Sequence, residues 1–346
     1  MSKIARARFA FCILKALPLA LLSLPLSAHA ATELLQVYTY DSLKGKGSLT
    51  EAILKDFVSN QCKIDFVSVG DSLQMVGRLE SEFDRGTPHA DVILGFDQFQ
   101  VPRLKRYLEA PPAVKGLIPQ IASAVSGMPA VPFDAGFMTF MVDTNRVAKT
   151  QFATWKDDWA AIPDKSTALI DPRTSTPGWG FYLLTRQTAG SDWRKLWKQL
   201  KPKWLTLAPS WDSAYALFTS GRASWVWSYL SSQAYHQAQG ELSRKAVRVD
   251  EGLPLQIELA GVVKKKRTVN QVRCVELFFS TLLSRTIQRE VPKRQWMFPV
   301  LQDVDLPSAF DGVPGFSKTK VLELKVPSPD DTSSMRREWE SEVRAQ

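Results

Sequence analysis

Short apolar runs alternate with longer stretches of mixed polarity in the first part of this 346-residue chain. The mixed stretches open at residues that cap helices, such as Ser48, and each apolar run ends in a polar cluster. We expect strands and helices to alternate in the order 34–39, 49–60, 63–69, 73–83 and 90–96, with a strand at either end. This β-α-β-α-β order predicts an α/β fold in which helices cover a parallel sheet.

The apolar pattern beyond residue 130 predicts a second lobe. A long apolar run at 130–142 is interpreted as the crossover into that lobe, and a strand at 254–263 returns the chain. The chain is longer than a single core usually allows. We therefore expect a signal peptide at 1–30, the first part of lobe I at 31–135, lobe II at 136–250, a return segment of lobe I at 251–310 and a C-terminal helical tail at 311–346.

The stretch 207–236 carries the densest group of aromatic and hydroxyl side chains. An apolar run at 223–227 predicts a buried strand, in which Trp225 and Trp227 are interpreted as core. Tyr229 and Tyr235 follow that run, and ligands of open α/β sheets bind beyond the carboxyl ends of strands. The pattern therefore favours a ligand site here, although buried packing is the commonest use of such rings.

Two polar loops precede predicted helices and are candidate anion sites. Asp71 and Ser72 follow the strand at 63–69, and the loop at 171–178 reads DPRTSTPG. Backbone N–H groups at a helix start can bind an anion. The alternative interpretation is structural, since Asp and Ser commonly cap helices and two prolines can stiffen a turn.

The N-terminus has the features of a secretion signal. Basic residues at Lys3, Arg6 and Arg8 precede a mainly apolar stretch at 9–26, and Ala28-His29-Ala30 forms a small-x-small cleavage site. Two prolines in the apolar stretch argue against a membrane anchor. We expect cleavage after Ala30 and export of a soluble protein.

Charge and cysteine content exclude several classes of function. The formal charge is +9, and four of the positive charges belong to the first 30 residues, which leaves +5 on the remainder. The run Lys264-Lys265-Lys266-Arg267 is interpreted as a solvated turn, so we expect no nucleic-acid partner. Cys62 and Cys274 remain after cleavage, and their pairing is left open. No cluster of Cys and His has the spacing of a metal site.

Read in order, several segments resemble the periplasmic thiamine-binding proteins of ABC import systems. The most specific are the DPRTSTPG loop at 171–178 and the segment from Tyr229 to His236. The resemblance extends over nearly the whole chain after the signal and also involves segments 37–42, 90–95 with Asp97, 131–134, 211–218 and 296–300.

The resemblance implies a two-lobed periplasmic-binding-protein fold of type II. Each lobe would be a mixed, mainly parallel sheet flanked by helices, with the ligand in the cleft. The protein would be a monomer without a cofactor or metal that delivers thiamine, or thiamine phosphates, to an ABC transporter permease in the inner membrane. The segments 44–47, Ala135 and Pro254 depart from the family pattern and imply a different pocket rim.

The resemblance also implies the ligand-binding residues. The aromatic rings that would sandwich thiamine fall on Tyr40, Tyr235 and Trp296. The contacts on the phosphate side fall on Asp71, Ser72, Ser175, Trp211 and Tyr229. Aromatic faces attract the permanent positive charge of the thiazolium ring, so few carboxylates are expected in the pocket.

Two other functions remain open from the sequence. A binder of another small cation would need a tyrosine pair with carboxylates or His for ferric iron, or several cleft carboxylates for a polyamine. An enzyme similar to thiaminase I would need a cysteine nucleophile at a strand end facing the cleft. Neither Cys62 nor Cys274 lies near a predicted polar cluster, so an enzyme is not expected.

Overall fold

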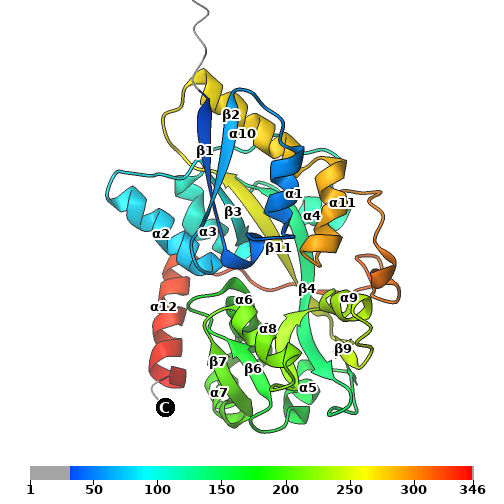
Figure 1. The fold of residues 1–346 in the computed structure, drawn as a ribbon. Helices are drawn as coiled ribbons and strands as arrows, with labels where there is room; N and C mark the ends of the chain where they lie inside the picture. Colours follow the sequence, from blue (N-terminus) through cyan, green and yellow to red (C-terminus); the bar gives the residue numbers. More distant parts are fainter. Residues whose placement is uncertain (1–31, 345–346) are drawn as a thin grey trace, which may run out of the picture. The chain divides into compact units, whose positions relative to one another are not determined.

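The computed structural model describes residues 32–344, and the predicted signal peptide lies outside this part (Figure 1). The strands are β1 (Glu33–Thr39), β2 (Cys62–Ser68), β3 (Val92–Asp97), β4 (Val131–Asp143), β5 (Gln151–Phe152), β6 (Thr167–Ile170), β7 (Trp204–Ala208), β8 (Trp225–Tyr229), β9 (Arg244–Ala246), β10 (Arg248–Val249), β11 (Leu253–Val262), β12 (Phe298–Pro299) and β13 (Val321–Leu322).

Helices connect and cover these strands. They are α1 (Leu49–Asp56), α2 (Ser72–Asp84), α3 (Val101–Leu104), α4 (Pro119–Ala124), α5 (Trp155–Ala161), α6 (Thr176–Ala189), α7 (Trp193–Leu200), α8 (Trp211–Thr219), α9 (Ser232–Ala238), α10 (Val269–Leu282), α11 (Arg285–Arg294) and α12 (Pro329–Trp339). None of the helices between residues 32 and 344 combines the length and the apolar character that crossing a bilayer requires.

One mixed sheet runs through the described chain in the order β2-β1-β3-β11-β4-β8-β6-β7. β1 is parallel to β2 and β3, and β6 is parallel to β7 and β8. The two central strands, β11 and β4, are antiparallel to each other and to their outer neighbours. The predicted mixed, mainly parallel α/β architecture is therefore confirmed.

Strand β4 takes part in two groups of strands. Its first half, up to Phe137, pairs with β11, whereas Met138 to Asp143 pairs with β8 and β9. We call β1, β2, β3, β11 and the first half of β4 the first strand group. The second half of β4 with β6, β7 and β8 is the second strand group. Figure 1 shows β4 running from one group into the other.

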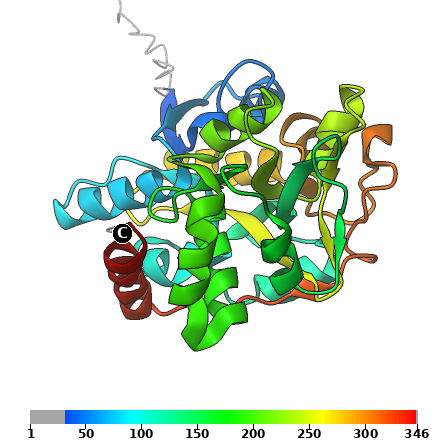
Figure 2. The ribbon, with the colours of Figure 1, turned by 90° about the horizontal axis from the view of Figure 1, so that it is seen from below.

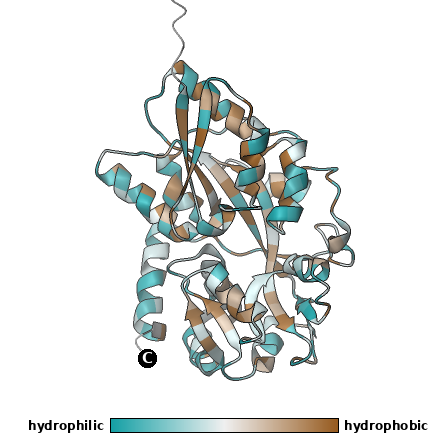
Figure 3. Cartoon of the chain, viewed as in Figure 1, coloured by the Kyte–Doolittle hydropathy of each residue, from teal (hydrophilic) through white to brown (hydrophobic). Residues whose placement is uncertain are grey.

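The core follows the apolar runs of the sequence. Strands β3, β4, β6 and β8 are buried along almost their whole length, while the covering helices alternate apolar and polar residues (Figure 3). Trp225 and Trp227 are fully buried, as predicted, and both rings meet the edge of Phe140. Burial of large aromatic rings contributes much of the free energy of folding in such a core.

The C-terminal helix α12 packs along α6 and α7 (Figure 2). Tyr182 Oη donates a hydrogen bond to the carbonyl of Met335 at 3.1 Å, and Arg186 pairs with Glu338 at 2.7 Å. The ring of Trp339 meets Trp197 edge-on and is fully buried. Helix α12 is therefore part of the packed structure.

Three sequence predictions were wrong in detail. The first helix ends at Asp56 instead of residue 60, because Phe57 has extended backbone. The strand expected at 223–227 is β8 and lies two residues later, so Tyr229 is its last residue. The basic run is only partly solvated: Lys265 pairs with Asp91 at 2.7 Å, and Arg267, 4% exposed, pairs with Glu109 at 2.7 Å.

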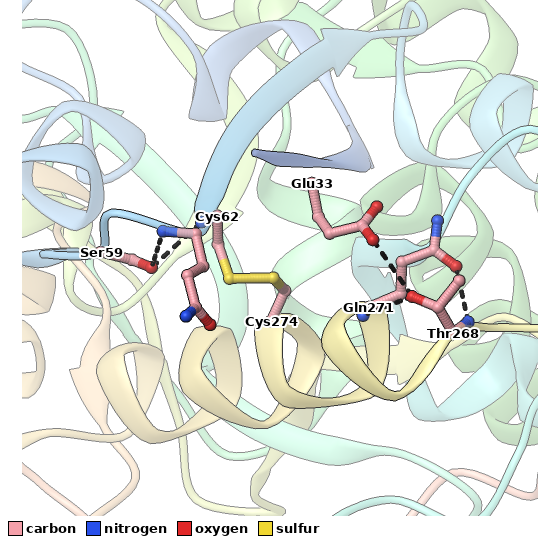
Figure 4. The surroundings of a disulfide bond; sticks show 7 residues. Glu33, Ser59, Cys62, Thr268, Gln271 and Cys274 are labelled. Atoms are coloured by element: carbon pink, nitrogen blue, oxygen red, sulfur yellow. Dashed lines mark hydrogen bonds between the residues drawn. A yellow bond between two sulfur atoms is a disulfide. The ribbon is translucent and has the colours of Figure 1, made fainter. Parts of the chain in front are cut away.

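A disulfide joins Cys62 at the start of β2 to Cys274 in α10 (Figure 4). It ties the edge strand of the sheet to a helix 212 residues further along the chain. Thr268, the N-cap of α10, donates a hydrogen bond to Glu33 in the neighbouring strand β1 at 3.1 Å. The return segment is thus fastened to the edge of the first strand group by a covalent bond and a hydrogen bond.

Candidate functional site

A cavity of about 280 Å³ lies where the two strand groups meet. Its size is near the lower end of the range of small-molecule pockets, ~300–1,000 Å³. Residues from both strand groups and from the segment after α11 line it: Tyr40, Ser42, Asp71, Ser72, Thr176, Pro177, Trp211, Tyr215, Tyr229, Ser232, Tyr235, Glu258, Gln295, Trp296 and Met297. Six of these side chains are aromatic, and no lysine or arginine of the described residues is among them.

Tyr40 is held in the cavity wall by contacts on several sides. It directly follows β1, and its hydroxyl donates to Glu258 Oε2 at 2.7 Å and accepts from Gln295 Nε2 at 2.5 Å. The ring lies over Gly95, where a Cβ atom would come within 2.3 Å of Tyr40 Cε1. Burial raises the pKa of Tyr40 well above its usual value, and the negative charge of nearby Glu258 raises it further. The phenol is therefore neutral at pH 7.

Tyr235 and Trp296 form adjoining walls of the cavity. Their ring centroids are 5.5 Å apart and the planes meet at 77°, edge against face. A flat ring sandwiched between two others needs about 7 Å between them, from two contacts of ~3.5 Å. This arrangement leaves no room for a flat ring between Tyr235 and Trp296.

The backbone of Trp296 is in the left-handed region, with φ of 56°. This conformation is uncommon for a bulky residue and costs about 1–3 kcal/mol. The peptide directly follows α11 and leads into β12, whose residues Phe298 and Pro299 pair with β4. The strained turn aims the indole at the cavity, and such strain is typical of ligand-binding segments.

The N-termini of α2, α6 and α8 meet at one end of the cavity. Ser72 Oγ donates to Thr176 Oγ1 at 2.9 Å, which links the starts of α2 and α6. The carboxylate of Asp71 caps α2 and also accepts from the backbone N–H of Trp211 at 3.3 Å, at the start of α8. Three helix starts that point to one place can stabilise an anionic or polar ligand group.

A hydrogen-bond network lies behind this end of the cavity. Tyr229 Oη donates to Gln256 Oε1 at 2.7 Å, and Gln256 Nε2 donates to Asp97 Oδ2 at 2.9 Å and to Thr176 Oγ1 at 3.1 Å. Burial raises the pKa of Asp97 to about 7. The network connects β3, β8, β11 and α6, so it fixes Tyr229 relative to both strand groups.

A row of carboxyl groups that was not expected from the sequence lies in the sheet beside the cavity, and one of its members lines the cavity. Glu258 in β11 lines the cavity, and in the sheet register it lies opposite Asp97 of β3 on one side and Asp134 of β4 on the other. The described lining holds two acidic residues, Asp71 and Glu258, and of these Glu258 had not been expected. A sequence signal existed, because Glu258 is a charged residue in the otherwise buried strand at 253–262.

Burial controls the protonation of this row. It raises the pKa of Glu258 to about 8 and raises the pKa of Asp134 well above its usual value. The negative charge of Glu258 also raises the pKa of Asp134, by less than burial does. Both oxygens of Asp134 are buried and, within residues 32–344, have no hydrogen-bond partner. A buried carboxyl group without partners favours its neutral form.

Seven of the eight predicted site residues lie in the cavity wall: Tyr40, Asp71, Ser72, Trp211, Tyr229, Tyr235 and Trp296. Ser175 is fully buried at the N-cap of α6, next to the lining residue Thr176, and does not itself reach the cavity. The departures at 44–47, Ala135 and Pro254 also lie outside the wall. Thr176, Tyr215, Ser232, Glu258 and Gln295 also line the cavity and are outside the eight predicted site residues, although Thr176 belongs to the loop at 171–178 that was predicted as a candidate anion site.

The fold and the position of the cavity define a class of protein. A solved periplasmic thiamin-binding protein matches with a TM-score of 0.77 at 28% identity, covering 91% of this chain and 96% of that one. A periplasmic binding protein from Actinobacillus pleuropneumoniae, solved with fructose 6-phosphate, shares the fold with a TM-score of 0.75. It is 18% identical, and the match covers 90% of this chain and 99% of that one. The protein is a periplasmic solute-binding protein of the two-lobed type.

Curated relatives define the family more narrowly. The thiamine-binding periplasmic protein of Brucella melitensis is 30% identical over 319 residues, which cover 91% of this chain and 92% of that protein. The protein of the same name from Salmonella typhimurium is 31% identical over 317 residues, 90% and 93% of the two chains. No protein-family model matches the chain. The chain belongs to the family of thiamine-binding periplasmic proteins.

Proposed function

We propose that this protein captures thiamine, or a thiamine phosphate, in the periplasm and delivers it as a monomer to the permease of an ABC transporter. The observation that carries the proposal is the cavity itself, which combines aromatic walls with an acidic base and lacks lysine and arginine among the described residues. Membership of the family supports the same ligand. A cation with flat rings suits such a cavity better than an anion or a sugar.

Each part of the ligand has a complementary region in the proposed complex. The aminopyrimidine and the thiazolium would stack on the faces of Tyr40, Tyr235 and Trp296, since aromatic faces attract a cation by about 0.5–2 kcal/mol each. The hydroxyethyl or phosphate tail would lie at the three helix N-termini. There Ser72, Ser175, Trp211 and Tyr229 would supply hydroxyl and N–H contacts, directly or through Thr176. The Asp71 carboxylate would accept a hydrogen bond from the hydroxyl group of an unphosphorylated tail.

Lobe closure follows from the topology in this proposal. We assign lobe I to 31–135 and 251–310, and lobe II to 136–250, so the cavity lies between lobes and β4 crosses from one to the other. A ligand that contacts both lobes stabilises the closed form in proportion to its differential affinity. The permease would then bind the closed form in preference to the open form.

The binding test uses the chain that begins at Ala31. Native mass spectrometry should detect thiamine or its phosphate co-purified with the protein, and calorimetry on refolded, ligand-free protein should give one site per chain. A ligand-free protein that gives no heat with thiamine up to about 1 mM, a binding free energy weaker than about −4 kcal/mol, would contradict the proposal.

A polyamine is the second candidate ligand, and the acidic residues Asp71 and Glu258 in the cavity wall favour it. A polyamine gains nothing from ring stacking, whereas thiamine does. The same calorimetry with spermidine separates the two: spermidine binding that survives Tyr235→Ala while exceeding thiamine binding would establish the polyamine.

The disulfide is relevant to the enzyme alternative. A thiaminase-like mechanism requires a thiolate nucleophile at the cleft. Cys62 and Cys274 are bonded to each other and neither lines the cavity. This supports a binding protein, and incubation of the purified protein with thiamine and an amine acceptor should leave the thiamine intact.

A further inference from the structure

We infer that Glu258, together with Asp134, is the charge-selective element of the cavity: the pair holds a proton when the site is empty and releases it when a cationic ring binds. The inference rests on the proposed function and identifies the positive charge of the ligand as the property that the site selects. A selective site of this kind would favour thiamine over an isosteric ligand whose thiazolium is replaced by a neutral ring.

The sheet register places the three carboxyl groups side by side on neighbouring strands. Glu258 is directly opposite Asp97 in β3 and directly opposite Asp134 in β4. Residues directly opposite in antiparallel strands point to the same side, with Cβ atoms about 4.5–5.5 Å apart, and like charges there are destabilising. The row is therefore stable only when protons or a bound cation neutralise it.

The three groups have different surroundings. Asp97 accepts hydrogen bonds from the N–H of Phe99 and from Gln256, so its negative form is partly stabilised. Asp134 is fully buried and has no hydrogen-bond partner within residues 32–344. Glu258 alone lines the cavity, and Tyr40 donates to it at 2.7 Å. Glu258 is thus the member that a ligand can contact, with Asp134 behind it.

The groups that face Glu258 come from every neighbouring element. They are Tyr40 after β1, Asp71 at the start of α2, Asp97 in β3, Asp134 in β4, Tyr229 in β8, and the neutral Gln295 and Trp296 after α11. The ionisable members of this set are all acids, and the described lining contains no lysine or arginine. A ligand cation would be the counter-charge that the protein itself does not supply.

The proton balance gives the direction of the pH dependence. In the empty site the pair of Glu258 and Asp134 is protonated. When the cation binds, Glu258 contacts it in the ionised form and one proton is released to the solvent. Because a proton is released, affinity should rise with pH, by up to about tenfold per pH unit between roughly pH 6 and pH 8. Burial sets the upper limit, since the pKa of Glu258 in the empty site is about 8.

The experiment is titration calorimetry at pH 7 in two buffers of different ionisation enthalpy, with thiamine and with its neutral-ring isostere. The wild type should release close to one proton with thiamine and none with the isostere. Glu258→Gln should abolish most of the release, weaken thiamine about ten- to a hundredfold, and change isostere affinity far less.

Asp158→Asn is the matched control. Asp158 is also fully buried, its oxygens also lack partners within residues 32–344, and burial also raises its pKa, but it lies in α5 and does not line the cavity. This variant should release the same proton as the wild type. Asp134→Asn, which preserves the volume of the side chain, should reduce the release as Glu258→Gln does.

The outcomes separate the inference from the proposed function. Thiamine binding without proton release, or equal losses of thiamine and isostere in Glu258→Gln, would overturn the inference and leave the proposed function standing. A wild type that binds neither compound would overturn both. The wild-type measurement needs no substitution, so a variant that fails to fold does not prevent the test.

Discussion

At the scale of single residues, the cavity is built from side chains whose orientation is fixed by a second contact. Tyr40 is held by Glu258 and Gln295, Tyr229 by Gln256, and Trp211 donates its indole N–H to Ser228 at 3.0 Å. Such contacts reduce the entropy that a ring would lose when a ligand binds. Substitutions should therefore distinguish ring faces, hydroxyl groups and backbone strain.

Tyr235 tests the importance of the ring face. Tyr235→Phe retains the face and should change thiamine affinity little. Tyr235→Ala removes stacking and cation attraction and should cost about 1–3 kcal/mol, roughly ten- to a hundredfold in affinity. A thiamine titration with circular dichroism as the folding control measures both, and parent-like binding by folded Tyr235→Ala would exclude the ring from the site.

Trp296 needs a different control because its backbone has positive φ. Trp296→Ala removes the ring but keeps the strain, whereas Trp296→Asn removes the ring at a residue type that tolerates this conformation. Both should lose about 1–3 kcal/mol of thiamine binding and part of the fluorescence change. If Trp296→Asn binds as the parent does, the effect of alanine comes from the backbone.

Ser175 tests the polar end of the cavity. If this end holds a phosphate and the start of α6 shifts on binding so that Ser175 can donate to it, Ser175→Ala should weaken thiamine monophosphate more than thiamine, because a hydrogen bond to a charged group is worth about 1.5–3 kcal/mol. Ser72→Ala, at a residue that lines the cavity, is the companion variant. Equal losses for both ligands, measured by calorimetry, would show that Ser175 only supports the start of α6.

At the scale of elements, the sequence predicts local structure well and pairing poorly. Strands β1 and β2 lie within one residue of their predicted limits, and Ser48 caps α1 as expected, since these features depend on neighbouring residues. The start of β8 depends on the pairing of Trp225 with Val142 of β4, which no local pattern contains. The row around Glu258 was missed for the same reason.

The aromatic part of the site was more predictable than its acidic part. Tyr229 and Tyr235 follow a recognisable strand, so their place at its carboxyl end could be expected. Glu258 belongs to the site only because β11 lies between β3 and β4 in the sheet. A charged residue in an apolar strand was the available signal, but its partners come from long-range register.

The disulfide is an element-scale contribution to stability. The double variant Cys62→Ser/Cys274→Ser should lose about 2–5 kcal/mol of unfolding free energy, because the unfolded chain regains the freedom of a long loop. Thiamine affinity should be unchanged, since neither cysteine lines the cavity. Urea unfolding and calorimetry on the same sample measure the two quantities, and a large loss of affinity with unchanged stability would contradict this assignment.

At the scale of the whole molecule, the proposed binding function requires both strand groups, since residues of both form the cavity. The cavity draws residues from both groups, and β4 connects them without interruption. Helix α12 packs on α6 and α7, so the end of the chain belongs to the second group. A small change in the angle between the two strand groups would thus change the distances between the residues that line the cavity.

Export has a direct test. Ala28-His29-Ala30 predicts cleavage that leaves Ala31 as the first residue. N-terminal sequencing or intact mass of the protein from the periplasmic fraction should show this start, and Ala30→Asp should slow processing. A periplasmic protein that still begins with Met1 would show the site to be wrong.

The positions of Cys62 and Cys274 in the sequence determine when, during synthesis, the bond between them can form. Synthesis proceeds from the N-terminus, so β2 exists long before α10, whose cysteine is 212 residues later. The bond closes only after the return segment has docked on the edge strand and the chain has reached an oxidising compartment. A chain truncated before residue 274 keeps a free thiol at Cys62, and that thiol chemically distinguishes an unfinished molecule from a finished one.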